Sequence, residues 1–170
     1  MPVAVKRLIS ALHNNEHIVI VGDFDADGAT SSALMVLALT AMGFKKVRFL
    51  VPNRFDYGYG LTPEIVDLAA QNKPQLIITV DNGISSVEGV AHALTLGIEV
   101  IITDHHLPGR VLPNAVAIVN PNQPLCEFPT KNLAGVGVAF YLLSALRVEL
   151  RKQNWFVENN LIEPNMAAWL

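Results

Sequence analysis

The sequence has very little cysteine and no long hydrophobic run. Cys126 is the only cysteine, which excludes an internal disulfide framework and a zinc site built on several thiolates. No apolar stretch approaches the ~20 residues of a membrane-spanning helix, and no charged-then-apolar leader opens the chain. We therefore expect a soluble, cytoplasmic protein with no membrane partner.

The chain also lacks a strong excess of either charge. Fifteen acidic residues face twelve lysines and arginines, a net charge of −3, which taken alone argues against a nucleic-acid binder. Five of the acids lie in the short motifs described below, and the remaining ten face twelve basic residues, a balance of +2. Divalent cations bound by those five acids would make the region attractive to phosphate. The net charge therefore neither excludes nor predicts a nucleic-acid partner.

What the chain does have is a regular alternation of strand-like and helical patterns. About half of its 170 residues are apolar, enough for one domain with a sizeable core. Strands are predicted at 18–21, 47–51, 76–80, 98–102 and 115–119, and helices at 3–13, 29–42, from 62, at 84–96 and at 136–153. This order predicts an α/β fold, with a doubly wound, mainly parallel five-stranded sheet and helices on both faces, as in Rossmann-like proteins. We expect a single domain at 1–170, cut at both ends from a longer multidomain protein.

Metal-ligating residue types close three of the predicted strands. They are Asp23, Asp25 and Asp27 after the first strand, Asp81 after the third, and Asp104, His105 and His106 after the fourth. In sheets of this kind ligands bind outside the carboxyl ends of the strands, so residues far apart in sequence are expected to meet there. Packing does not require so many carboxylates at a buried edge. The pattern therefore predicts one metal site.

Three known chemistries use the Asp-x-Asp-x-Asp-Gly pattern. A calcium hand needs Glu at loop position 12, where this chain has Leu34. An aspartyl-phosphate phosphatase usually has Thr four residues after its nucleophile, but Ala29 stands at that distance from Asp25. A two-metal phosphoesterase, in which aspartates from successive strands share paired ions, fits all three motifs. Asp81, alone at its strand end, suits the carboxylate that bridges both ions, and oxygen and imidazole ligands favour Mn²⁺ or Mg²⁺.

The other candidate residues lie at the same predicted edge. His105 and His106 are adjacent and should point in different directions, so that one binds an ion while the other holds a phosphate oxygen. In the loop at 52–61, Arg54 offers a planar fork for phosphate, the glycines allow close backbone approach, and the tyrosines are suited to stacking on bases. Glycines at 135 and 137 open the last long helix, where either phosphate binding or helix-entry packing would explain them.

Four ordered segments resemble the DHH phosphoesterase superfamily. They are Gly-Asp-Phe-Asp-Ala-Asp-Gly, Pro-Asn-Arg-Phe-Asp-Tyr-Gly-Tyr-Gly-Leu, Thr-Val-Asp-Asn-Gly-Ile-Ser and Thr-Asp-His-His. The similarity covers essentially the whole chain, including Leu-Ala-Gly-Val-Gly-Val-Ala-Phe at 133–140, and is strongest to bacterial exonucleases that digest single-stranded DNA from 5′ to 3′ in recombination and repair. The resemblance implies a DHH catalytic domain, two Mn²⁺ or Mg²⁺ ions and single-stranded DNA as substrate. Single-strand-binding protein and recombination helicases are implied partners.

The resemblance also implies a role for each motif. The implied metal ligands are Asp23, Asp25, Asp27, Asp81 and His105, with Asp81 bridging the ions. The implied catalytic residues are His106, Arg54 and Asp104, and the implied substrate-binding residues are Asn53, Arg54, Gly58, Tyr59, Gly60, Gly135 and Gly137. Family members carry a further metal-binding aspartate and DNA-gripping domains beyond the point where this sequence stops, so weak or absent nuclease activity is expected of this chain alone.

Two other functions remain open at this stage. A DHH hydrolase of pyrophosphate, short oligonucleotides or cyclic dinucleotides would use the same chemistry on a smaller substrate. A non-catalytic, metal-binding interaction module would need no bridging carboxylate. The loop at 53–61 and the segment at 135–140 favour the exonuclease.

Overall fold

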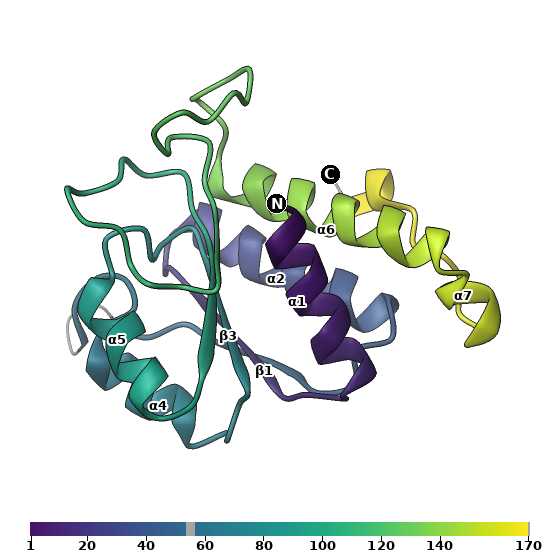
Figure 1. Ribbon diagram of the computed structural model, residues 1–170, viewed down its shortest axis with the longest axis horizontal. Helices are drawn as coiled ribbons and strands as arrows, with labels where there is room; N and C mark the ends of the chain where they lie inside the picture. Colours follow the sequence, from purple (N-terminus) through teal and green to yellow (C-terminus); the bar gives the residue numbers. More distant parts are fainter. Residues whose placement is uncertain (54–56, 170) are drawn as a thin grey trace.

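The computed structural model describes residues 1–53 and 57–169 and shows a five-stranded sheet in which every strand pair is parallel (Figure 1). The strands are β1 (Ile18–Gly22), β2 (Val47–Leu50), β3 (Leu76–Val80), β4 (Glu99–Thr103) and β5 (Ala117–Val119), in the spatial order β2-β1-β3-β4-β5. The helices are α1 (Pro2–His13), α2 (Ala26–Ala41), α4 (Pro63–Ala70), α5 (Val87–Thr95), α6 (Gly135–Lys152), α7 (Trp155–Glu158) and the 3-10 helix η1 (Met166–Trp169). The predicted α/β class and parallel five-stranded sheet are confirmed.

Apolar strands buried on both sides explain why helices cover both faces of this sheet. Every residue of β1 and β3 is buried. Ile18 and Ile20 belong to the core under α1, α2 and α6, whereas Val19 and Val21 belong to the core under α4 and α5. Figure 1 shows these two groups of helices on opposite sides of the sheet. A strand such as β1, which has no polar side chain, suits this arrangement, because neither of its faces meets water.

Helix α2 begins three residues earlier than the sequence pattern predicts. Asp25 is its N-cap, and its side chain accepts a hydrogen bond of 2.9 Å from the backbone N–H of Gly28. This cap satisfies a backbone donor that would otherwise lack a partner, so the helix starts at Ala26. The first turn then carries Asp27 on a rigid element.

The carboxyl ends of four strands lie in register. Gly22 pairs with Val80, Val80 with Thr103, and Thr103 with Val119. The residues that directly follow are Asp23, Asp81, Asp104 and Asn120, which we call the strand-end row. Strand order reverses between β1 and β3, because β2 lies on the far side of β1. In open α/β sheets, ligands bind at such a reversal, so the row stands at the expected place for a site.

Length and hydropathy determine whether a helix can span a membrane. In the described part of the chain, each helix is too short or too polar to span a bilayer.

Candidate metal centre

The segment from the end of β1 to the first turn of α2 brings three aspartates to the edge of the sheet. Asp23 accepts a hydrogen bond of 2.8 Å from the N–H of Phe24, and Asp25 caps α2 as described above. Asp27 follows in the first helical turn. A strand that passes directly into a capped helix therefore fixes the backbone of all three residues.

Asp27 connects this segment to helix α6. Its two carboxylate oxygens accept hydrogen bonds from the backbone N–H groups of Gly135 (2.7 Å) and Val136 (2.8 Å) at the start of α6. The positive end of a helix stabilises a carboxylate at this position. Oδ1 also accepts a long hydrogen bond of 3.5 Å from the Ser31 hydroxyl, whereas Oδ2 keeps a further lone pair with which it can bind a cation.

The two glycines of α6 have different surroundings. A Cβ atom at Gly135 would lie 2.6 Å from Asp81 Oδ1, so only glycine lets α6 approach this carboxylate. A Cβ atom at Gly137 would meet only the side chain of Leu133, at 2.5 Å. The N–H of Gly137 is bonded to Ala134 O and that of Gly135 to Asp27. The sequence interpretation of helix-entry packing accounts for both glycines, and their predicted contact with substrate stays a prediction.

Asp81 is, with Asp104, one of the two most buried carboxylates of the centre. The residue is 1% exposed and has a left-handed backbone with φ of 61°. Burial, followed by the nearby charges of Asp27 and Asp25, raises its pKa from 3.8 to about 7. Asp81 Oδ1 lies 3.0 Å from His105 Nε2, yet this buried oxygen accepts no hydrogen bond from any described residue. A buried oxygen that accepts no hydrogen bond lowers the stability of the folded state. We therefore expect this oxygen to bind another partner.

Asp104 organises the histidine pair. Its Oδ1 accepts the N–H groups of His105 (2.7 Å) and His106 (3.0 Å) and lies 2.7 Å from His106 Nδ1, while its Oδ2 accepts the N–H of Ile84. Burial alone would lower the pKa of His106, but the hydrogen bond and charge of Asp104, with the charges of Asp81 and Asp23, raise it. His106 is therefore held as a cation more readily than an ordinary histidine.

The two histidines have different partners. His105 Nε2 lies between Asp81 and Asp27, at 3.0 Å and 3.6 Å from their oxygens. His106 turns to Asp104 and to Tyr59, whose hydroxyl oxygen is 3.4 Å from Nδ1. One ring therefore points into the carboxylate cluster and the other lies beside it.

Two groups of possible metal ligands share one residue. Among the described residues, Asp23, Asp25 and Asp81 form one group and Asp81, His105 and His106 the other, with ligand atoms within 4.8 Å of one another in each group. Asp81 thus stands between two adjacent positions for a cation. Carboxylate oxygens and imidazole suit Mn²⁺ or Mg²⁺, and a cation would satisfy the Oδ1 of Asp81, which accepts no hydrogen bond from the described residues. The residues present therefore fit a pair of divalent cations.

The predicted substrate loop borders this centre. Arg54 lies outside the described residues, so its predicted contact with phosphate stays a prediction. Asn53 accepts the N–H of Tyr57 through its backbone oxygen. The hydroxyl of Tyr59 is 3.5 Å from Asp81 O, and Gly58 and Gly60 both have positive φ values. Tyr59 and Leu61, at the end of this loop, line a cavity of about 540 Å³, which also reaches Ser86, Asp104 and His106.

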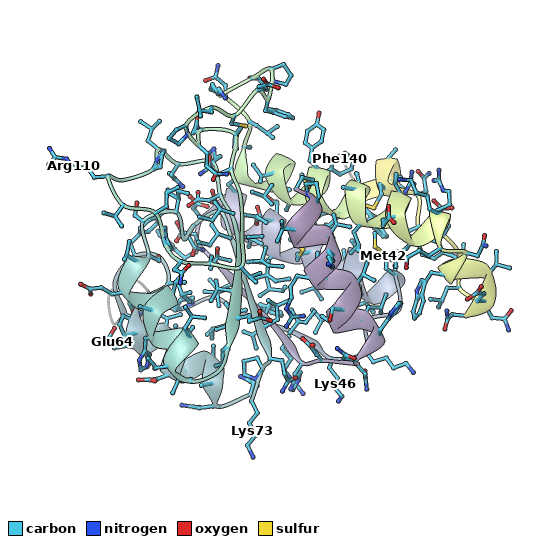
Figure 2. All side chains as sticks on the ribbon, viewed as in Figure 1. Met42, Lys46, Glu64, Lys73, Arg110 and Phe140 are labelled. Carbon is cyan, nitrogen blue, oxygen red and sulfur yellow. The ribbon has the colours of Figure 1, made fainter. Side chains whose placement is uncertain are left out.

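Two lysines lie far from the acidic residues of the centre. Figure 2 shows Lys46 and Lys73 at the edge where β2 and β3 begin, away from the strand-end row. These two lysines therefore do not neutralise the acidic cluster, which favours cations.

Sequence reasoning missed the asparagines that hold the strand ends. Asn82 is buried, and its Nδ2 donates to Val21 O (3.1 Å) and Val80 O (2.9 Å), which ties β1 to β3 beside Asp81. Its place next to Asp81 in the third motif was the available signal. Asn120 and Asn122 contact the histidine pair and are described below.

The fold and the centre together define an α/β domain with a candidate two-cation site at the carboxyl edge of a parallel sheet. The comparison with protein families assigns this class more closely: the chain belongs to the DHH family, whose N-terminal domain matches residues 17–169. The resemblance expected from the sequence motifs is confirmed.

The relatives of this chain include bacterial exonucleases. The chain is 61% identical over 167 residues to the single-stranded-DNA-specific exonuclease RecJ of Salmonella typhimurium, an alignment that covers 98% of this chain and 29% of the relative. A crystal structure of RecJ bound to manganese matches 86% of this chain and 37% of that one, with 38% identity and a TM-score of 0.78. The Mg²⁺ complex of RecJ from Thermus thermophilus matches 95% of this chain and 17% of that one, with 27% identity and a TM-score of 0.54. The chain thus spans less than a third of the length of its Salmonella relative.

Proposed function

We propose that this chain is the DHH catalytic domain of an exonuclease that hydrolyses single-stranded DNA with two Mn²⁺ or Mg²⁺ ions. The observation that carries the proposal is Asp81, a buried carboxylate that two groups of possible ligands share and whose Oδ1 lacks a hydrogen-bond donor. The similarity to RecJ proteins supports the choice of substrate, and the manganese and magnesium complexes of RecJ support the choice of metal.

Five residues would hold the ions. They are Asp23, Asp25, Asp27, Asp81 and His105, with Asp81 in the bridging position. When bound, two such cations supply the positive charge that aligns and stabilises the attacking and leaving oxygens of a phosphodiester. The chain's own contribution is rigidity: capped helices and in-register strand ends hold the ligands before the substrate arrives.

His106 and Asp104 would act on the phosphate from beside the ions. Asp104 keeps His106 oriented at 2.7 Å and raises its pKa, so that Nε2 can present a proton to a phosphate oxygen. Arg54 would add a second positive contact. Tyr59 stands next to His106 and would contact the terminal nucleotide, together with Asn53, Gly58, Gly60 and the glycines of α6.

The proposal extends to the cellular setting. We expect digestion from 5′ to 3′ in DNA recombination and repair, in the cytoplasm, where bacterial DNA is found. Single-strand-binding protein and recombination helicases are proposed partners. The names of the bacterial relatives support a single-stranded-DNA-specific exonuclease, whereas the polarity, the compartment and the protein partners rest on the family resemblance of the sequence motifs.

The test compares full-length protein with two aspartate variants on 5′-labelled single strands, duplexes and pyrophosphate. Mn²⁺-dependent release of nucleotides from single strands alone is expected. Asp81→Asn should abolish it, whereas Asp67→Asn, which alters an exposed acid paired with His92, should not. Preferred hydrolysis of pyrophosphate would point to the smaller-substrate DHH activity, and hydrolysis that survives Asp81→Asn would overturn the proposal.

A further inference from the structure

The loop after β5 reaches back to the histidine pair. Asn120 directly follows β5, is 3% exposed, and donates a hydrogen bond of 3.0 Å from its Nδ2 to the backbone oxygen of His106. Asn122 donates from its Nδ2 to the backbone oxygen of His105. Two side-chain amides, two residues apart, therefore bind two consecutive carbonyl groups.

These bonds complete the polar contacts of the histidine backbone. Asp104 accepts the N–H groups of both histidines, as described above. All four backbone polar groups of His105 and His106 are thus bonded to side chains. Both residues lie beyond the last residue of β4, so the sheet does not supply these bonds. The directions in which the two rings point depend on this set of side chains rather than on the sheet.

The two asparagines are themselves fixed. Asn120 Oδ1 accepts a hydrogen bond of 2.7 Å from the backbone N–H of Asn122. Lys131 donates from its Nζ to the backbone oxygens of Pro121 and Cys126 and so closes the loop that carries both residues. An amide is suited to this position because it donates to a carbonyl and accepts from an N–H at the same time.

We propose that Asn120 and Asn122 are positioning residues of the metal centre, in which Asn122 orients His105 toward Asp81 and Asn120 orients His106 toward Asp104. The proposal rests on the function proposed above and adds residues that contact neither ion nor substrate. Groups that orient metal ligands through hydrogen bonds commonly change metal affinity about 10- to 100-fold when they are removed.

The experiment measures Mn²⁺ affinity of the full-length protein by the electron paramagnetic resonance of free Mn²⁺. Asn122→Ala and Asn122→Asp should each raise Kd by about 10- to 100-fold. The added charge of Asp alone would tighten cation binding, so weaker binding by that variant reports on geometry. Gln123→Ala is the matched control, because the Gln123 amide donates to Ile118 O and Asn120 O within the same loop. It should leave Kd within about twofold.

Asn120→Ala should have a different effect. Mn²⁺ affinity should stay near that of the unmodified protein, while kcat on single strands falls about tenfold without a matching change in KM. If this buried substitution prevents folding, Asn120→Ser keeps a polar group in its place and carries the same expectation. Unchanged kcat in a folded Asn120 variant would overturn its role, and unchanged Kd in both Asn122 variants would overturn the other.

Ring-nitrogen NMR shifts of the metal-free protein separate this inference from the proposed function. Asn122→Ala should move the signals of His105, and Asn120→Ala those of His106, whether or not Mn²⁺ binds. Absence of Mn²⁺ binding by the unmodified protein would overturn the proposed function, whereas unmoved histidine signals in both variants would overturn the positioning roles.

Discussion

Asp81 and Asp104 are neighbouring strand-end aspartates that should respond in opposite ways to the same substitution. In metal-free protein, the pKa of Asp81 rises from 3.8 to about 7, first through burial. The folded state thus favours the protonated carboxyl, and its stability falls as pH increases from about 4 to about 7. At pH 8, this preference lowers the free energy of unfolding by about 4 kcal/mol relative to an aspartate of ordinary pKa. Asp81→Asn removes the charge, and Asn tolerates the left-handed φ of 61°.

We therefore expect Asp81→Asn to stabilise the metal-free protein at pH 8, by up to about 4 kcal/mol, and to have little effect near pH 4. Asp104→Asn should instead destabilise it by about 1–3 kcal/mol, because an amide cannot accept all the hydrogen bonds that this carboxylate accepts. Urea unfolding in the presence of a chelator, from pH 4 to pH 8, measures both effects. A less stable Asp81→Asn variant at pH 8, or a gain that does not vary with pH, would refute the reasoning.

Three further outcomes follow from the geometry. Mn²⁺ at 100 times its Kd should raise the free energy of unfolding by about 2.7 kcal/mol, and a chelator should reverse this; an unchanged urea midpoint would contradict the metal site. Gly135→Ala should weaken Mn²⁺ binding about tenfold or more, because its Cβ would lie 2.6 Å from Asp81 Oδ1. Gly137→Ala should not, since it meets only a leucine side chain; equal losses would argue against a specific role of the first glycine. The raised pKa of His106 should fall in Asp104→Asn, as followed by NMR titration of the ring, and an unchanged value would mean that their 2.7 Å contact is not its cause.

The fold was predictable because local pattern and tertiary environment agree. The run at 76–80 is apolar except for Thr79 and becomes a strand buried on both faces, with the predicted bounds. Parallel strands place their carboxyl ends at one edge, so the meeting of the acidic motifs followed from strand order alone.

The contacts within the metal centre were harder to predict from the sequence. Asp27 is bonded to residues more than 100 positions away, and no local pattern indicates that α6 begins against its carboxylate. The early start of α2 was missed because Asp-Ala-Asp-Gly resembles a loop, while the cap at Asp25 draws it into the helix. Asn120 was visible as a polar residue after an apolar run, but an amide suggests no metal chemistry by itself.

The register of the strand-end row has a consequence for how such sequences can change length. The pairing of the strands sets the positions of the polar residues in the row, because each of them directly follows a paired residue. Loss of one residue within β3 would draw Asp81 back by about 3.3 Å and turn alternate side chains to the other face. Insertions at the opposite edge, as between α4 and β3, leave the spacing intact. Homologous sequences should therefore vary in length at that edge and keep the strand-to-motif distances constant.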